Sequence, residues 1–137
     1  MKMTHLTIAC LIGGMALAAL ADEVDTSKLP PPSDKKDLTF DKDIKPIFEN
    51  SCVKCHSGEK PKARLRLDTL ENVLAGTPKE KVLKPGNSAD SILVHNIARI
   101  GEDEDEWMPP PKNRANIGPL TPEEIGLIRA WIDQGAK

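Results

Sequence analysis

The sequence predicts an all-α fold: one small domain with short helices and long loops. Apolar residues recur at helical spacing in segments near residues 44–51, 88–100 and 121–134. Twelve prolines punctuate the chain, and the proline-rich stretches between these segments cannot form regular structure. Two phenylalanines and two tryptophans are the only aromatic residues, so the polypeptide alone builds a modest core.

Residues 1–21 have the pattern of a secretory signal peptide. A mostly apolar stretch from Leu6 to Leu20 ends in Ala19-Leu20-Ala21, which fits an A-x-A cleavage site. We expect export to the periplasm and no stable membrane span once this leader is removed. The alternative is an uncleaved membrane anchor, although the apolar run is short and interrupted by Gly13 and Gly14. A lipid anchor on Cys10 is disfavoured, because that cysteine lies too early, inside the apolar stretch.

The remaining chain divides into residues 22–38 and residues 39–137. The first part is charged and proline-rich without apolar periodicity, which predicts a flexible linker, or alternatively an extended arm lying against the domain. The second part has a suitable length for a single domain. The formal net charge of −2 does not indicate nucleic-acid binding.

Two helices are expected in the first half of the domain. Asp43 is a suitable N-cap for a short helix that places Pro46 at its third position and runs into Cys52. The segment PKARLRL then reads as extended. Asp68 followed by Glu71 predicts the start of a brief helix that stops at Gly76.

Two more helices are expected in the second half. One runs from Ser88 to about Ile100 with Asn87 as its cap, and residues 102–119 form a loop without regular structure. The last helix has Thr121 as N-cap with Pro122 and Glu124 completing a capping box, and Gly135 follows its end. Within it, Gly126 predicts a close approach by another backbone, which we expect to be the first helix.

The run CVKCH at residues 52–56 indicates a covalent haem. The thiols of Cys52 and Cys55 can add to the two vinyl groups of a porphyrin, and His56 follows at once to deliver an imidazole to the iron. Bacteria attach such haems outside the cytoplasm, which agrees with the predicted export. The third cysteine leaves with the leader, so one haem c is the expected cofactor and no disulfide framework remains. A buried porphyrin would also enlarge the modest core.

The sixth iron ligand decides between electron transfer and binding of small molecules. Met108 is the only methionine left after leader removal, and the prolines at 109–111 would hold its backbone extended. His95 is the competitor, but Leu93 and Ile97 lie roughly 160° from it around a helix, so it should face water or a haem edge. The metal ligands expected are therefore His56 and Met108; Met108 as an ordinary apolar residue is the alternative.

Several segments together resemble a known family: IKPIFENSCVKCH, ARLRLDTLENVLAG, KPGNSADSILVHNI, MPP and LTPEEIGLIRAWIDQGA. In this order the chain is similar to the single-haem cytochrome c domain found in planctomycetes and related bacteria, a variant of class I cytochrome c. The similarity spans about residues 40 to 136. It implies a class I cytochrome c fold, His56 and Met108 as axial ligands, and electron transfer. The chain departs from the family where GTPKEKVLKPG replaces a glycine-rich stretch.

These observations predict a periplasmic monohaem c-type cytochrome that carries single electrons between redox protein partners. It would not be an enzyme, because iron with six ligands has no open position for a substrate. One alternative is a peroxidase-like haem enzyme or gas sensor with a labile sixth ligand. Another is a zinc site of Cys52, Cys55, His56 and His95, which is disfavoured because adjacent Cys55 and His56 are poorly placed to share one tetrahedron.

Some charged and aromatic residues have open interpretations. The acidic run Glu102–Glu106 can be a solvated turn, a docking rim for a basic redox partner, or a calcium site, although it lacks the spacing of a calcium loop. Trp131 can pack on a haem edge or in a helix interface. The candidates to pair with haem propionates are Arg64, Arg66, Arg99 and Arg114.

Overall fold

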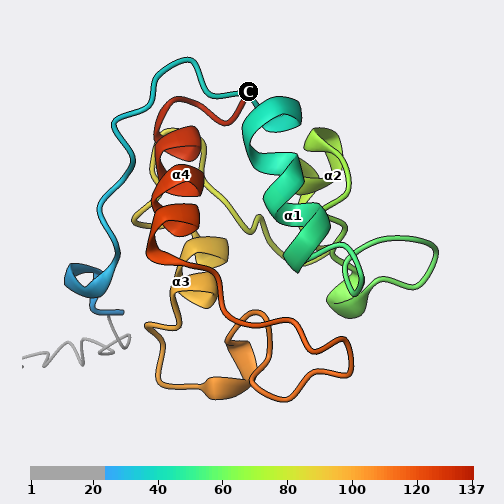
Figure 1. The fold of residues 1–137 in the computed structure, drawn as a ribbon. Coiled ribbons are helices and arrows are strands. Elements are labelled where there is room, and N and C mark those ends of the chain that lie inside the picture. Colours follow the sequence, from blue (N-terminus) through green and yellow to red (C-terminus); the bar gives the residue numbers. More distant parts are fainter. Residues whose placement is uncertain (1–23) are drawn as a thin grey trace, which may run out of the picture.

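The computed structural model describes residues 24–137, so the predicted signal peptide lies outside the described residues. Four α-helices follow one another within this described range: α1 (Lys45–Ser51), α2 (Leu70–Ala75), α3 (Ile92–Ala98) and α4 (Pro122–Asp133). Over residues 24–137 there is no β-strand, and the prediction of a helical fold is confirmed. In the same range no helix has the length and apolarity to cross a bilayer. Figure 1 shows α1 and α4 side by side, with α3 below α4 and a long loop beneath them.

The chain becomes helical earlier than predicted before α1. Phe40–Ile44 form a π-helical turn that continues directly into α1. Asp43 lies inside this turn, so the prediction that it caps the helix is wrong. Its carboxylate accepts hydrogen bonds from the Thr39 backbone N–H (3.0 Å) and from the Lys35 ammonium (2.6 Å). Asp43 therefore satisfies the N–H of Thr39, one turn earlier in the chain, and not an N–H of the helix that was predicted to follow it.

The second helix also begins slightly later than its sequence signal. Thr69, not Asp68, is the N-cap of α2, and its hydroxyl accepts a hydrogen bond from the Asn72 N–H at 3.2 Å. The Asp68 carboxylate instead accepts from the Asn72 side chain at 2.8 Å. Gly76 ends the helix as predicted, with φ of 73°.

The third helix is shorter than predicted because its expected first turn is used elsewhere. The backbone N–H and hydroxyl of Ser88 donate to the two carboxylate oxygens of Asp133 in α4, at 2.7 and 3.0 Å. Helix α3 therefore starts at Ile92 after Ser91 and ends at Ala98, before the predicted Ile100. This contact joins the start of α3 to the end of α4.

The last helix agrees with its sequence signals. Thr121 and Glu124 form the predicted capping box, with hydrogen bonds of 3.2 and 2.9 Å in opposite directions. Part of the core lies between this helix and the π-helical turn before α1, where the Trp131 ring centroid is 5.8 Å from that of Phe40. Phe40 in turn meets Phe48 edge to face at 5.9 Å. Trp131 is thus a fully buried core residue.

Residues 24–38 form an arm along α4, visible in blue and cyan beside the red helix in Figure 1. Leu29 and Leu38 are buried, and the Ser33 N–H donates to the Gly126 carbonyl at 2.9 Å. Further along, the Gln134 side chain bonds the Lys35 carbonyl at 2.8 Å. The flexible linker predicted for residues 22–38 is therefore corrected to an extended arm over its described part, because backbone hydrogen bonds and two buried leucines offset the entropy of ordering it.

The arm also explains Gly126. A Cβ atom on Gly126 would lie 2.7 Å from the Pro31 carbonyl oxygen, closer than side chains tolerate. The close approach predicted at Gly126 exists, but the arm makes it and the first helix does not.

Candidate functional site

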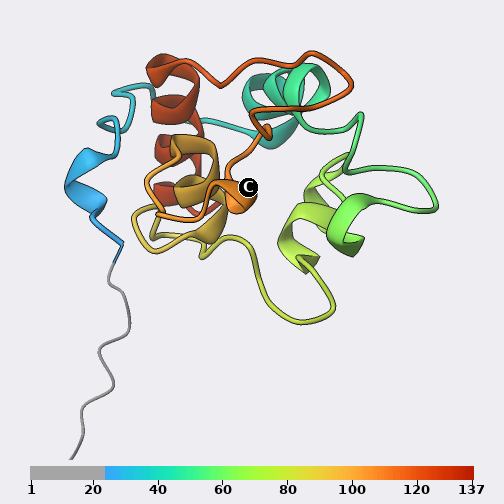
Figure 2. The same cartoon turned by 90° about the horizontal axis from the view of Figure 1, so that it is seen from below.

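The predicted site residues gather around one cavity of about 190 Å³. Cys52, Cys55 and His56 come from the end of α1 and the turn that follows it, and Met108 comes from the loop after α3. Figure 2 shows these two parts of the chain from below, with α1 and α2 on one side, α3 on the other, and the loop after α3 crossing toward α1 before it enters α4. Most of the other lining side chains are apolar, among them Phe48, Leu65, Leu67, Val82, Leu93, Ile97 and Leu120.

The cysteines sit in a turn that is closed by backbone hydrogen bonds. The Cys52 N–H donates to the Phe48 carbonyl at 2.8 Å, which ends α1. The N–H groups of Cys55 and His56 both donate to the Cys52 carbonyl, at 3.1 and 3.0 Å. Both thiols are free, and burial raises the pKa of Cys52 to about 12, with the nearby Cys55 and Glu124 adding to this effect. Cys52 is therefore a neutral thiol at neutral pH.

The imidazole of His56 is oriented by the segment that follows the turn. Its Nδ1 lies 3.3 Å from the Leu65 carbonyl oxygen, and because a carbonyl can only accept, Nδ1 carries the proton. The lone pair is then on Nε2, the arrangement found in metal-bound histidines. Burial lowers the pKa of His56, which favours the neutral, ligating form. The Leu67 N–H donates to the His56 carbonyl at 2.8 Å and fixes the same segment across the turn.

The backbone of Met108 is tied to α3. Its N–H donates to the Asn96 carbonyl at 3.0 Å, and Asn96 itself lines the cavity. Further along this loop, the Asn113 side chain donates to the carbonyls of Pro110 and Ile117, at 2.9 and 2.8 Å, and accepts from the Ile117 N–H. The prediction that residues 102–119 contain no regular structure is wrong at Glu104–Glu106, which form a 3₁₀ turn.

This set of donors fits a covalent haem c: two free thiols, a neutral imidazole and a thioether around one apolar cavity. Residues 52–112 also match the family model described as Planctomycete cytochrome C. This match supports a planctomycete-type cytochrome c domain over these residues. The family implies covalent haem c and a haem-based redox function. No curated protein and no solved structure matches the chain.

His95 lies outside the cavity of the cytochrome c domain. Its Nε2 is 2.6 Å from the Ala89 carbonyl oxygen, within the turn that precedes α3. The four residues considered for zinc therefore do not converge. Within residues 24–137, no three His, Cys, Asp or Glu side chains are grouped so that they could hold a metal ion.

None of the four candidate arginines lines the cavity of the cytochrome c domain. Arg66 pairs with Asp68 at 2.9 Å, and Arg64 and Arg114 are exposed. Arg99 donates to the Pro109 carbonyl at 2.5 Å, next to Met108. The acidic run Glu102–Glu106 is exposed throughout.

The sequence patterns did not reveal the residues that support these ligands. The Leu65 carbonyl, the Asn96 carbonyl and the Asn113 side chain act through backbone atoms or through loop closure, which leave no periodic signal. The only available hint was the position of Leu65 within the segment ARLRLD, which the family resemblance already included.

Proposed function

We propose that this protein is exported to the periplasm, carries one covalent haem c and transfers single electrons between larger redox proteins. It does not catalyse a reaction by itself. The observation that supports this proposal most directly is that all four predicted haem-contacting side chains, from two separate segments, line the same apolar cavity. The chain has no excess of basic residues, which favours protein partners over nucleic acid.

The residues have distinct roles in this proposal. Cys52 and Cys55 would hold the haem through thioether bonds, His56 would ligate the iron through Nε2, and Met108 would supply the sixth ligand. A bound haem supplies one-electron iron chemistry. The Leu65 carbonyl keeps the imidazole ring oriented.

The apolar cavity wall has its own function. Leu93 and Ile97 of α3 and Val82 of the preceding loop keep water away from the ligand atoms. A hydrophobic shell of this kind raises the preference of a haem site for its less charged, reduced state. Thioether ligation acts in the same direction, so we expect a higher potential than bis-histidine ligation would give.

The test is a comparison of Met108→Ala with the parent protein, both made with a cytochrome c maturation system. The parent should retain its haem after denaturation and, when oxidised, show the weak far-red band of methionine-ligated ferric haem. Met108→Ala should lose this band and bind carbon monoxide rapidly when reduced. Leu93→Ala is a matched control, because it truncates a cavity side chain without removing a ligand and should keep the band.

Four results would contradict parts of the proposal. Mass analysis that finds no haem on the exported protein would exclude covalent attachment, and an unchanged far-red band in Met108→Ala would exclude methionine as ligand. Rapid carbon monoxide binding by the parent protein would favour the haem enzyme or gas sensor. N-terminal sequencing that finds no cleavage after Ala21 would contradict the proposed leader.

A further inference from the structure

Arg99 occupies a backbone conformation that arginine rarely adopts. It caps the end of α3 with φ of 54° and ψ of 43°, the left-handed region in which glycine is the usual residue. A side chain at such a position is tolerated where its contacts compensate for the backbone strain. The question is therefore which contacts Arg99 makes.

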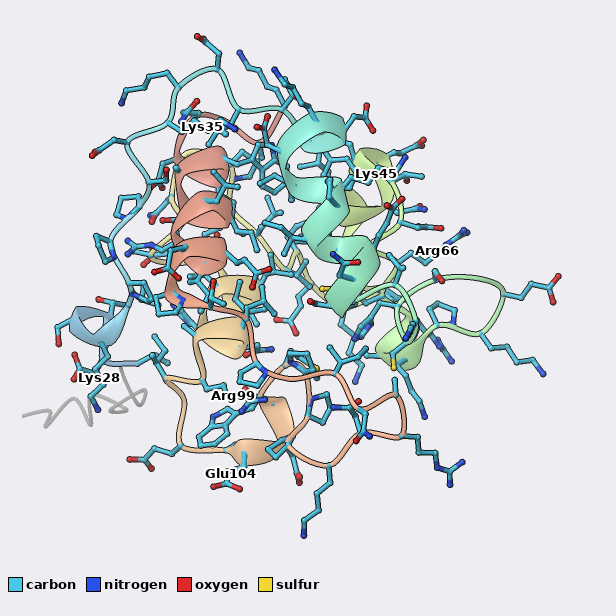
Figure 3. All side chains as sticks on the ribbon, viewed as in Figure 1. Lys28, Lys35, Lys45, Arg66, Arg99 and Glu104 are labelled. Carbon is cyan, nitrogen blue, oxygen red and sulfur yellow. The ribbon has the colours of Figure 1, made fainter. Side chains whose placement is uncertain are left out.

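The Arg99 side chain holds the residues on both sides of Met108. Its Nη2 donates to the Pro109 carbonyl at 2.5 Å, and its guanidinium lies 5.9 Å from the centroid of the Trp107 ring. The Trp107 indole N–H in turn donates to the Gly101 carbonyl at 2.9 Å. Figure 3 places Arg99 between the end of α3 and the turn that carries Glu104.

The charge of Arg99 is not used in an ion pair. Five carboxylates follow within seven residues of the chain, yet none of the salt bridges between residues 24 and 137 includes Arg99. Its Nε is buried and has no hydrogen-bond partner. The observed contacts of the guanidinium are therefore a carbonyl and an aromatic face, and both belong to the segment that carries Met108.

We propose that Arg99 is a positioning residue for Met108. By holding Trp107 and Pro109 against the end of α3, it keeps the thioether directed at the cavity and sets how readily an outside ligand displaces it. This inference rests on the proposed function, in which Met108 ligates the iron. One further contact acts with it, because the Met108 N–H donates to the Asn96 carbonyl at 3.0 Å.

The test is an imidazole titration of the oxidised, haem-loaded protein and its Arg99→Gly variant. Glycine adopts the left-handed conformation freely, so this variant removes the side-chain contacts and relieves the backbone. Loss of a hydrogen bond from a charged donor predicts that imidazole binds about tenfold to a hundredfold more tightly. The far-red band should weaken in parallel. Arg114→Gly is the matched control, because it removes an exposed arginine from the same loop and should change neither reading.

Two further variants make the result decisive. Arg99→Lys keeps the charge but not the planar fork, so its imidazole affinity should lie between those of the parent and Arg99→Gly. It provides the answer if Arg99→Gly fails to fold. In a Met108→Ala background, Arg99→Gly should have no additional effect, because there is no thioether left to position.

The outcomes separate the two proposals. If Met108→Ala changes imidazole binding and the Arg99 variants do not, the positioning role is wrong and the proposed function stands. An equal response to Arg114→Gly, or a full additional effect of Arg99→Gly on Met108→Ala, also overturns the positioning role. If Met108→Ala itself changes nothing, both proposals fail.

Discussion

Replacing Gly126 by alanine tests the packing of the N-terminal arm through the sign of a stability change. In a helix interior without neighbours, alanine is more favourable than glycine by about 1 kcal/mol. Gly126 lies in α4, so this gain would appear if the arm were a free linker. In the structure, however, the new Cβ would lie 2.7 Å from the Pro31 carbonyl oxygen, and the arm would have to move.

The cost of moving the arm follows from its contacts. The hydrogen bond from the Ser33 N–H to the Gly126 carbonyl, 2.9 Å long, contributes about 1 kcal/mol. Leu29 is 8% exposed, and returning its side chain to water costs about 1.5–3 kcal/mol. The freed arm regains conformational entropy, and alanine contributes its helical gain. We therefore expect Gly126→Ala to lower the free energy of unfolding by about 1–2 kcal/mol.

The assay is urea unfolding of the haem-loaded protein, with amide hydrogen exchange at Ser33 as a local measurement. Gly126→Ala should unfold at lower urea and exchange the Ser33 amide faster. The control is the same substitution in a chain shortened to begin at Asp34, where the clashing Pro31 is absent and alanine should stabilise. Stabilisation of the full-length protein by Gly126→Ala would refute the packed arm.

Three other changes are expected to have defined effects. The hydrogen bond from the Lys35 side chain, and next that from the Thr39 N–H, hold the pKa of Asp43 below 3.8. The contribution of the Asp43 carboxylate to stability is therefore present above pH 3.8 and is lost as the pH falls through the lowered pKa. Asp43→Asn should make the loss of stability with falling pH less steep below about pH 4. Thr121→Ala should lower the free energy of unfolding in urea by about 1 kcal/mol because it removes the N-cap of α4, whereas Glu123→Ala, two residues later, should lower it less. Converting Glu102–Glu106 to amides should flatten the salt dependence of electron transfer to a basic redox protein, and equal salt slopes would remove the docking-rim hypothesis.

The sequence predicted best those features that depend on neighbours along the chain. The capping box needs only Thr121 and Glu124, three residues apart, and it is present as expected. The cysteines and the histidine of the CVKCH run are likewise close in sequence, so a single turn brings them to the same cavity. In both cases the geometry of one turn determines the result, and distant contacts cannot easily change it.

Predictions failed where a partner outside the local sequence pattern competed with that pattern. The first turn predicted for α3 does not form, because Ser88 donates hydrogen bonds to Asp133, which is 45 residues away in the chain. The N-cap predicted at Asp43 was displaced because Lys35 and Thr39 use its carboxylate. The flexible linker was inferred from average composition. Composition does not show that Leu29 and Leu38 are buried, or that Gly126 of α4 leaves room for the backbone of the arm.

The two sides of the candidate haem site consequently differ in how mutations should affect them. His56, the proposed ligand, is adjacent to the cysteines proposed to attach the haem and is fixed by short-range hydrogen bonds, so changes there should abolish haem attachment or ligation outright. Met108 depends on a loop held by Arg99, Asn96 and Asn113, each contributing one or a few hydrogen bonds. Removing one of these contacts removes only a part of the interactions that hold the loop, so ligation by Met108, the proposed sixth ligand, should weaken in steps. Variation in the potential and in ligand exchange should therefore arise from the Met108 loop, and loss of the cofactor from the CVKCH turn.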